Sequence, residues 1–152
     1  MRTDPVDLCI RTMVEADLDQ VVAIEQACQL TPWTRSSFAD SLQGSYRCQV
    51  LECAGEVAGF LVMSWVLDEA HVLNVAVTPA WQGRGLAGQL LEQAFAAARQ
   101  QQITVVYLEV RESNLAAQRL YDRLGFNAYG CRPNYYRRGT GHEDALLLML
   151  EL

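Results

Sequence analysis

The most regular pattern of apolar and polar positions lies in residues 71–91. In its first part Leu73, Val75 and Val77 alternate with smaller or polar residues, which is the period of a half-buried strand. Pro79 ends this strand, because proline has no backbone N–H to donate to a neighbouring strand. The second part has the period of a helix. Its apolar stripe consists of Ala87, Leu90, Leu91, Ala94 and Ala98. The stretch therefore predicts a strand, a loop and a helix in succession.

Patterns on both sides of this stretch predict the remaining elements. Strands are expected at residues 8–11, 49–52, 57–66, 104–110, 126–131 and 145–150. Helices are expected from about Asp17 to Cys28, from a Thr34 cap to Leu42, and over residues 115–124 before a Gly125 cap. Residues 53–56 are expected to form a hairpin turn and residues 132–143 a polar loop. This order predicts an α/β fold with a mixed sheet of six to seven strands and about four helices on its faces, in one domain spanning residues 1–152.

Composition narrows the class of protein. No run of about 18 apolar residues occurs, so no membrane span is expected. The opening MRTDPVDLCIR is polar and contains Pro5, which is atypical of an export signal and favours a cytoplasmic location. The five cysteines are odd in number and include no C-x-x-C pair, which favours reduced core thiols over disulfides or a zinc site. The net charge of −6 argues against direct nucleic-acid binding and is compatible with a basic protein or an amine as partner.

Three glycines surround the start of the predicted helix, at Gly83, Gly85 and Gly88. Glycine lets backbone approach a ligand closely, and the first amides of a helix have no partners within it, so such a helix start binds phosphate groups. The spacing also matches the fingerprint of dinucleotide-binding proteins, with Glu109 about twenty residues further on. In that class, however, the first glycine follows the first strand directly, whereas several strands come before it here. A glycine-rich turn that only packs the helix on the sheet is the third interpretation.

The segment Gln82-Gly83-Arg84-Gly85-Leu86-Ala87 resembles the Q/R-x-x-G-x-G/A motif of the GCN5-related N-acetyltransferase (GNAT) superfamily. Residues 74–79 before it resemble the central strand of that superfamily and its exit. Further segments resemble the bacterial RimI type, in the same order and over nearly the whole chain. They are Val66-Leu67-Asp68-Glu69-Ala70, Leu108-Glu109-Val110-Arg111, Asn114, Leu120-Tyr121, Leu124-Gly125-Phe126, Asn134-Tyr135-Tyr136 and Glu143-Asp144-Ala145. Residues 137–142, and Ala87 where many members have glycine, depart from the usual sequence.

The resemblance implies a GNAT fold and transfer of an acetyl group from acetyl-CoA to the α-amine of an N-terminal alanine in a small-subunit ribosomal protein. Glu109 is implied to be the general base and Tyr121 the general acid of a direct attack by the amine. The residues implied to bind acetyl-CoA are Val75, Ala76, Val77, Gln82, Gly83, Arg84, Gly85, Leu86, Ala87, Gly88 and Asn114. No metal site is expected, because His71 and His142 are isolated in the sequence.

The residues alone leave simpler roles open. Glu109 could lie on an exposed face of its strand, Tyr121 could only pack in the core, and Asn114 could only cap its helix. Three aromatic residues are expected in loops, where they either line a peptide groove or cover the edge of the core: Trp33, Tyr135 and Tyr136.

Two other functions are compatible with the same residues. The first is a GNAT acetyltransferase that acts on a small-molecule amine such as a polyamine or an amino sugar. The second is a dinucleotide-binding module without chemistry, which follows from the other interpretation of the glycines. In each case the chain is expected to act without nucleic acid or membrane, as a monomer or a weak oligomer.

Overall fold

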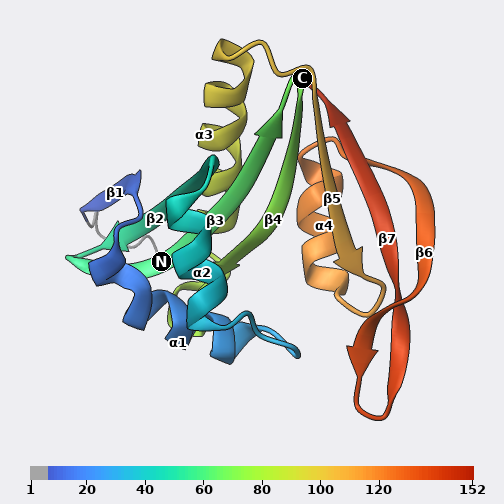
Figure 1. Ribbon diagram of the computed structural model, residues 1–152, viewed down its shortest axis with the longest axis horizontal. Helices are drawn as coiled ribbons and strands as arrows, with labels where there is room; N and C mark the ends of the chain where they lie inside the picture. The colour runs from blue at the N-terminus through green and yellow to red at the C-terminus, as the bar shows by residue number, and fades with distance from the viewer. Residues whose placement is uncertain (1–6) are drawn as a thin grey trace.

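All strands lie in one mixed sheet. The structure is a computed structural model that describes residues 7–152. Its strands follow the order β1-β2-β3-β4-β5-β7-β6, and among them only β4 and β5 pair in parallel (Figure 1). The strands are β1 (Leu8–Thr12), β2 (Tyr46–Cys53), β3 (Glu56–Val66), β4 (Glu69–Val77), β5 (Val105–Arg111), β6 (Asn127–Arg138) and β7 (Gly141–Glu151). The predicted mixed sheet is confirmed. Pro5, on which the expectation about export rests, lies outside the described residues.

Helices cover both faces of the sheet. They are α1 (Leu18–Cys28), α2 (Arg35–Gln43), α3 (Leu86–Gln100) and α4 (Leu115–Arg123), with short 3-10 turns at Glu15–Asp17 and Pro79–Trp81. Buried residues of α1 and α2 form one cluster with the sheet, and those of α3 and α4 form another on the opposite face. Thr34 Oγ1 accepts a hydrogen bond from Ser37 N at 3.1 Å, so the predicted cap is confirmed. In residues 7–152 none of the helices is long and apolar enough to cross a membrane.

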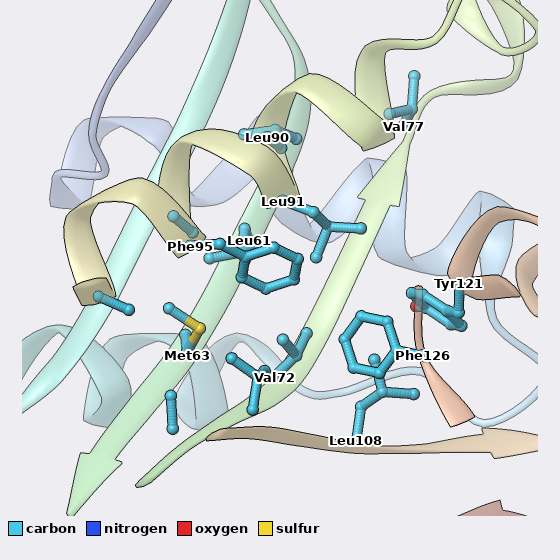
Figure 2. Close-up of a cluster of buried hydrophobic side chains, with 14 of the residues drawn as sticks. Leu61, Met63, Val72, Val77, Leu90, Leu91, Phe95, Leu108, Tyr121 and Phe126 are labelled. Atoms are coloured by element: carbon cyan, nitrogen blue, oxygen red, sulfur yellow. The ribbon is translucent and has the colours of Figure 1, made fainter. Parts of the chain in front are cut away.

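The larger cluster, called the α3 cluster from here on, joins α3 and α4 to the centre of the sheet. Figure 2 shows Leu90, Leu91 and Phe95 of α3 beside residues of β3 and β4. The ring centroid of Phe126 lies 5.8 Å from that of Phe95 and 5.6 Å from that of Tyr121, so α4 joins the same core. Complete burial of each large apolar side chain contributes about 1.5–3 kcal/mol, which fixes α4 beside β4 and β5.

A bulge at Leu73 changes which side chains of β4 face α3 and α4. In the pairing with β3, Val62 lies opposite Asn74 and Met63 opposite Val72, so Leu73 has no partner. Before the bulge Val72 joins the α3 cluster, and after it Val75 packs there. Leu73 itself is 37% exposed, so its predicted place on the apolar face is wrong. A single unpaired residue shifts the two-residue period of a strand, which side-chain alternation alone does not reveal.

Of the connections predicted at residues 53–56 and 132–143, the first agrees with the structure and the second does not. The turn predicted at residues 53–56 is confirmed, and Ala54 and Gly55 have the positive φ values, 53° and 83°, of a two-residue turn. The polar loop predicted at residues 132–143 is wrong, because most of it continues β6 and β7 up to the pair Arg138–Gly141. Both faces of this part of β6 are largely exposed, so backbone pairing holds it without an apolar period. Tyr135 and Tyr136 are therefore strand residues.

The five cysteines do not all behave as core thiols. Cys48 and Cys53 are buried as expected, and Cys28 is half-buried. Cys9 and Cys131 are exposed, so the prediction is wrong for these two. All five are free thiols. Burial raises the pKa of the Cys48 thiol to about 11, which keeps that thiol protonated and unreactive at neutral pH.

Candidate active site

A cavity opens where β4 and β5 separate. Their parallel pairing is limited to residues 69–71 and 105–107. Beyond it, residues 72–75 and 108–111 line a cavity of about 160 Å³. The remaining lining comes from α1 and the segment after it (Glu25, Gln29, Thr31, Trp33), from the start of α4 and the helix itself (Asn114, Ala117, Tyr121), and from Tyr136 of β6. Because α1 and α4 lie on opposite faces of the sheet, the opening passes from one face to the other.

Glu109 faces the α1 side of this opening. Its neighbours Leu108 and Val110 are buried in the α3 cluster, so the alternation of β5 directs Glu109 to the opposite face. The Glu109 side chain is 16% exposed, and its Oε2 lies 2.8 Å from Nε2 of His71. The interpretation of Glu109 as a residue of an exposed face is therefore wrong, and His71, which is isolated in the sequence, has a carboxylate partner in the fold. A half-buried carboxylate that lines a cavity is placed to accept a proton there.

Tyr121 reaches the same cavity from the α3 and α4 side. It is 7% exposed, packs edge-on against Phe126 and also lines the cavity, so Tyr121 packs in the core and faces the opening at the same time. Burial, with a smaller effect from Tyr136, raises the pKa of Tyr121 well above that of an ordinary phenol. The hydroxyl is therefore protonated at neutral pH and available as a proton donor.

The glycine loop borders a second cavity, of about 260 Å³, beyond the end of β4. Gly85 precedes the first helical residue of α3 with φ +77°, and Gly83 has φ +80°. A Cβ atom built at either glycine meets nothing within 4 Å, so the loop surface is open at both positions. Leu86, Ala87 and Gly88 of the first turn also line this cavity. Since first-turn amides lack partners within the helix and carry a partial positive charge, this cradle fits a pyrophosphate.

The last residues of β4 connect the two cavities. Val75, Ala76 and Val77 pair with Leu61, Phe60 and Gly59 of β3 on one edge, while β5 has already separated from the other. That free edge lets an extended chain add its own hydrogen bonds, as an extra strand would. The residues predicted to bind acetyl-CoA thus lie along one path from the opening to the glycine loop.

Three of the predicted binding residues have structural partners in the chain. Gln82 Nε2 donates to the carbonyl of Val77 at 2.8 Å, so Gln82 holds the strand exit against the loop. The guanidinium of Arg84 lies 4.6 Å from the ring centroid of Trp81. Asn114 lines the first cavity, and its Oδ1 accepts from Ala117 N at 3.2 Å, so the predicted helix cap is confirmed.

A buried carboxylate fixes the segment between α1 and α2. Glu25 is 1% exposed, and its Oε2 accepts from Trp33 N at 2.9 Å and from Asn74 Nδ2 at 3.0 Å. These bonds join α1 to the α1–α2 segment and to β4, on the Glu109 side of the cavity. Burial raises the pKa of the Glu25 carboxyl above its usual range, against the opposing effect of the two hydrogen bonds. Sequence reasoning missed Glu25, although a carboxylate among Leu18, Val21 and Ile24 on one helix face is a usable signal.

Arg111 joins three segments around the opening. Its guanidinium donates to Thr31 Oγ1 at 2.6 Å, to the carbonyl of Arg137 at 2.8 Å and to Glu143 Oε2 at 3.1 Å. It also lies 4.5 Å from the ring centroid of Tyr136. Arg111 therefore connects the α1–α2 segment to the β6–β7 hairpin across the end of β5. Sequence reasoning missed this role too, because it depends on contacts between segments far apart in the chain.

The two faces of the opening suit two different reactants. An extended arm that ends in phosphates finds hydrogen-bond partners along β4 and amides at the start of α3. On the α1 face the opening presents the carboxylate of Glu109, and on the α3 and α4 side it presents Tyr121. These arrangements are those of an N-acyltransferase that uses a coenzyme A thioester. In residues 7–152 no group of three or more His, Cys, Asp or Glu side chains is arranged to hold a metal ion.

Comparison with known proteins narrows this class to one family. The model of the acetyltransferase (GNAT) family matches residues 18–126. The chain is 37% identical over 143 residues to the [ribosomal protein bS18]-alanine N-acetyltransferase of Escherichia coli K12, covering 94% of this chain and 97% of that protein. It is 36% identical to the protein of the same name from Haemophilus ducreyi, covering 94% and 99%.

The fold agrees with these sequence matches. The crystal structure of the ribosomal-protein-S18-alanine N-acetyltransferase from Escherichia coli superposes with a TM-score of 0.89 at 36% identity, covering 95% of this chain and 94% of that one. The chain belongs to the acetyltransferase (GNAT) family, whose members transfer acetyl groups from acetyl-CoA. The parallel sheet of a dinucleotide-binding domain is absent from the described residues, so that alternative is wrong.

Proposed function

We propose that this protein acetylates the α-amine of an N-terminal alanine with acetyl-CoA, and that its substrate is ribosomal protein bS18. The observation that carries the chemistry is that Glu109 and Tyr121 line one opening from opposite faces of the sheet. The substrate follows from relatives about as long as this chain that are named for acetylating the alanine of bS18. Such a substrate also implies a cytoplasmic enzyme.

Acetyl-CoA lies along β4 in this proposal. The backbone of Val75, Ala76 and Val77 pairs with the extended arm through the free strand edge. The pyrophosphate is bound by the loop and first-turn amides, with Arg84 as a nearby cation. The loop and first-turn residues are Gly83, Gly85, Leu86, Ala87 and Gly88. Gln82 contributes by holding the end of β4, and Asn114 by fixing the start of α4 beside the opening.

The transfer needs no covalent enzyme intermediate. Glu109 takes a proton from the substrate ammonium, and a modest base suffices because an α-amine has a pKa of about 7.7–8.0. The nitrogen lone pair then attacks the thioester carbonyl, a C–N bond forms and the C–S bond breaks. Tyr121 gives its proton to the departing thiolate. Two protons leave nitrogen and one arrives at sulfur, so each turnover releases one proton to solvent.

Glu109→Gln tests the base. The substitution keeps the size of the side chain and removes its capacity to accept a proton, so turnover should fall by about 10²-fold or more. The loss should be greatest at low pH, where more of the amine is protonated. The affinity for acetyl-CoA should change little, because Glu109 faces the amine side. Unchanged turnover would remove Glu109 from the mechanism.

Mass spectrometry tests the substrate. An alanine-starting peptide with the N-terminal sequence of bS18 is incubated with the enzyme and acetyl-CoA, beside the same peptide with a blocked N-terminus and free lysines. One acetyl group on the free N-terminus alone is the expected result. No acetylation of either peptide by folded enzyme that binds acetyl-CoA would overturn the proposal and point to small amines as acceptors.

We further propose that residues 1–152 act as one domain and as a monomer or weak oligomer. All the described strands belong to one sheet, which supports the first part. Light scattering at the concentrations of the activity assay tests the second part, and a stable dimer or larger assembly would contradict it.

A further inference from the structure

His71 lies where it can act on the proposed base. It is in β4 opposite Tyr107 of β5, within the short parallel pairing of the two strands. Ala70 and Val72, its neighbours, are buried in the α3 cluster, so His71 shares the other face of the sheet with Glu109. The Nε2 atom of His71 lies 2.8 Å from Oε2 of Glu109. His71 is the more exposed of the two side chains, at 36% against 16%.

We propose that His71 is a positioning residue for the proposed acetyl transfer, in which its Nε2, 2.8 Å from Oε2 of Glu109, holds that oxygen and leaves Oε1 to take the proton of the substrate amine. This inference rests on Glu109 acting as the base. A polar contact this close restricts the rotation of a carboxylate that otherwise has several staggered positions. A base that is fixed before the substrate arrives loses less freedom at the moment of reaction.

The other charged and titratable groups around Glu109 do not supply this contact. Tyr129 and Tyr136 of β6 lie close enough for the charge of Glu109 to contribute to raising their pKa values, with burial the larger cause. The guanidinium of Arg111 lies over Tyr136 and is bonded to Thr31, Arg137 and Glu143. The positive charge of Arg132 partly offsets the rise in the pKa of Tyr129, and its guanidinium lies 4.8 Å from the ring centroid of Tyr135. His71 is therefore the cationic or N–H-bearing side chain in direct contact with the Glu109 carboxylate within residues 7–152.

Two substitutions test the contact. His71→Gln keeps an amide N–H group near the position of Nε2, so kcat should stay within about threefold of wild type. His71→Leu removes the polar group, and kcat should fall about tenfold or more with unchanged affinity for acetyl-CoA. His142→Gln, at the other histidine of the chain, is the matched control and should leave kcat unchanged.

Each outcome decides the proposal. Equal kcat in the His71→Leu and His71→Gln variants would overturn it. Binding of acetyl-CoA by each variant establishes that it is folded. If wild-type enzyme acetylates no peptide N-terminus, the proposed function fails by itself, and the rates of the same variants are measured with a small primary amine. A readout that needs no acceptor is the proton NMR signal of the His71 Nε2–H, which should lie downfield in wild type and lose that position in Glu109→Gln.

Discussion

The complementary roles proposed for Glu109 and Tyr121 follow from the alternation of side chains in the sheet. Glu109 faces α1 because Leu108 and Val110 face α3, and Tyr121 comes from the helix on the α3 side. A nitrogen that loses protons on one face and a sulfur that gains one on the other can react in the opening between them.

Tyr121→Phe should slow acetyl transfer without unfolding the protein. The ring still packs against Phe126, so the unfolding free energy should change by less than about 1 kcal/mol. The thiolate loses its proton donor, and kcat should fall by about 10²-fold. Steady-state kinetics and thermal unfolding measure the two effects. Tyr129→Phe, at an exposed tyrosine of β6, is the control, and wild-type rates for Tyr121→Phe would leave Tyr121 a packing residue only.

Glu25→Gln should change how stability depends on pH. Burial raises the pKa of Glu25 in the folded protein above its usual value of 4.5, so ionisation costs the folded state more than the unfolded state. The contribution of Glu25 to stability is therefore full below that value and is lost as pH rises through the folded pKa. The glutamine oxygen can still accept from Trp33 N, but it does not ionise.

Urea unfolding at several pH values checks this prediction. The stability of Glu25→Gln relative to wild type should rise between about pH 4.5 and neutral pH. Asp19→Asn, which removes a carboxylate that is 88% exposed on the same helix, is the charge-matched control. A difference between Glu25→Gln and wild type that stays constant over this range would contradict the argument.

At the scale of elements, the junction of β4 and α3 is the most constrained part of the site. Gly83 and Gly85 both have φ near +80°, and Gln82 fastens the loop to the carbonyl of Val77. These features keep the first-turn amides of α3 in line with the free edge of β4. The backbone conformation of the loop is therefore part of the proposed binding site.

Gly85→Ala and Gly88→Ala should have opposite effects on stability. At Gly85 the backbone has φ +77°, which costs an alanine about 1–2 kcal/mol although no atom of the protein lies within 4 Å of the added Cβ. Gly88 is inside α3, and its Cβ would meet Leu120 Cδ1 at 3.7 Å, an ordinary contact. Alanine there should stabilise the helix by about 0.5 kcal/mol. Urea unfolding of the two variants makes the comparison, and equal effects would contradict it.

The same elements explain which predictions the sequence supports. The strand-loop-helix of residues 71–100 is predictable because burial imposes the two periods on its side chains. Residues 132–143 are not, because β6 is held by pairing with β7 while both of its faces stay exposed. The contact of His71 with Glu109 depends on the register of β4 and β5, which no local pattern encodes. The roles of the binding and catalytic residues remain predictions.

At the scale of the whole molecule, backbone pairing is shortest at the centre of the sheet, between β4 and β5. β4 and β5 share three residue pairs, whereas β5 and β7 share seven. The unpaired edges of β4 and β5 and the cavity between them lie where the extended arm of acetyl-CoA can add hydrogen bonds to the sheet. Binding of acetyl-CoA should therefore stabilise the whole fold.

Thermal unfolding with and without ligand checks this expectation. Acetyl-CoA at about 100 times its Kd should stabilise the protein by about 2.7 kcal/mol, which raises Tm by about 5–10 °C. NAD at the same concentration is the control for the dinucleotide interpretation and should leave Tm unchanged. Stabilisation by NAD and none by acetyl-CoA would contradict the assignment of the glycine loop.

Because of the bulge at Leu73, one residue in β4 decides which face of the sheet all later side chains of the strand occupy. With Leu73 in place, Val75 and Val77 point into the α3 cluster while Asn74 reaches Glu25 on the other face. Without it, every later side chain would exchange faces, so that Asn74 would enter an apolar core and Val75 would meet a carboxylate. Deletion of one residue from this strand therefore reverses the inward and outward orientation of every side chain that follows it.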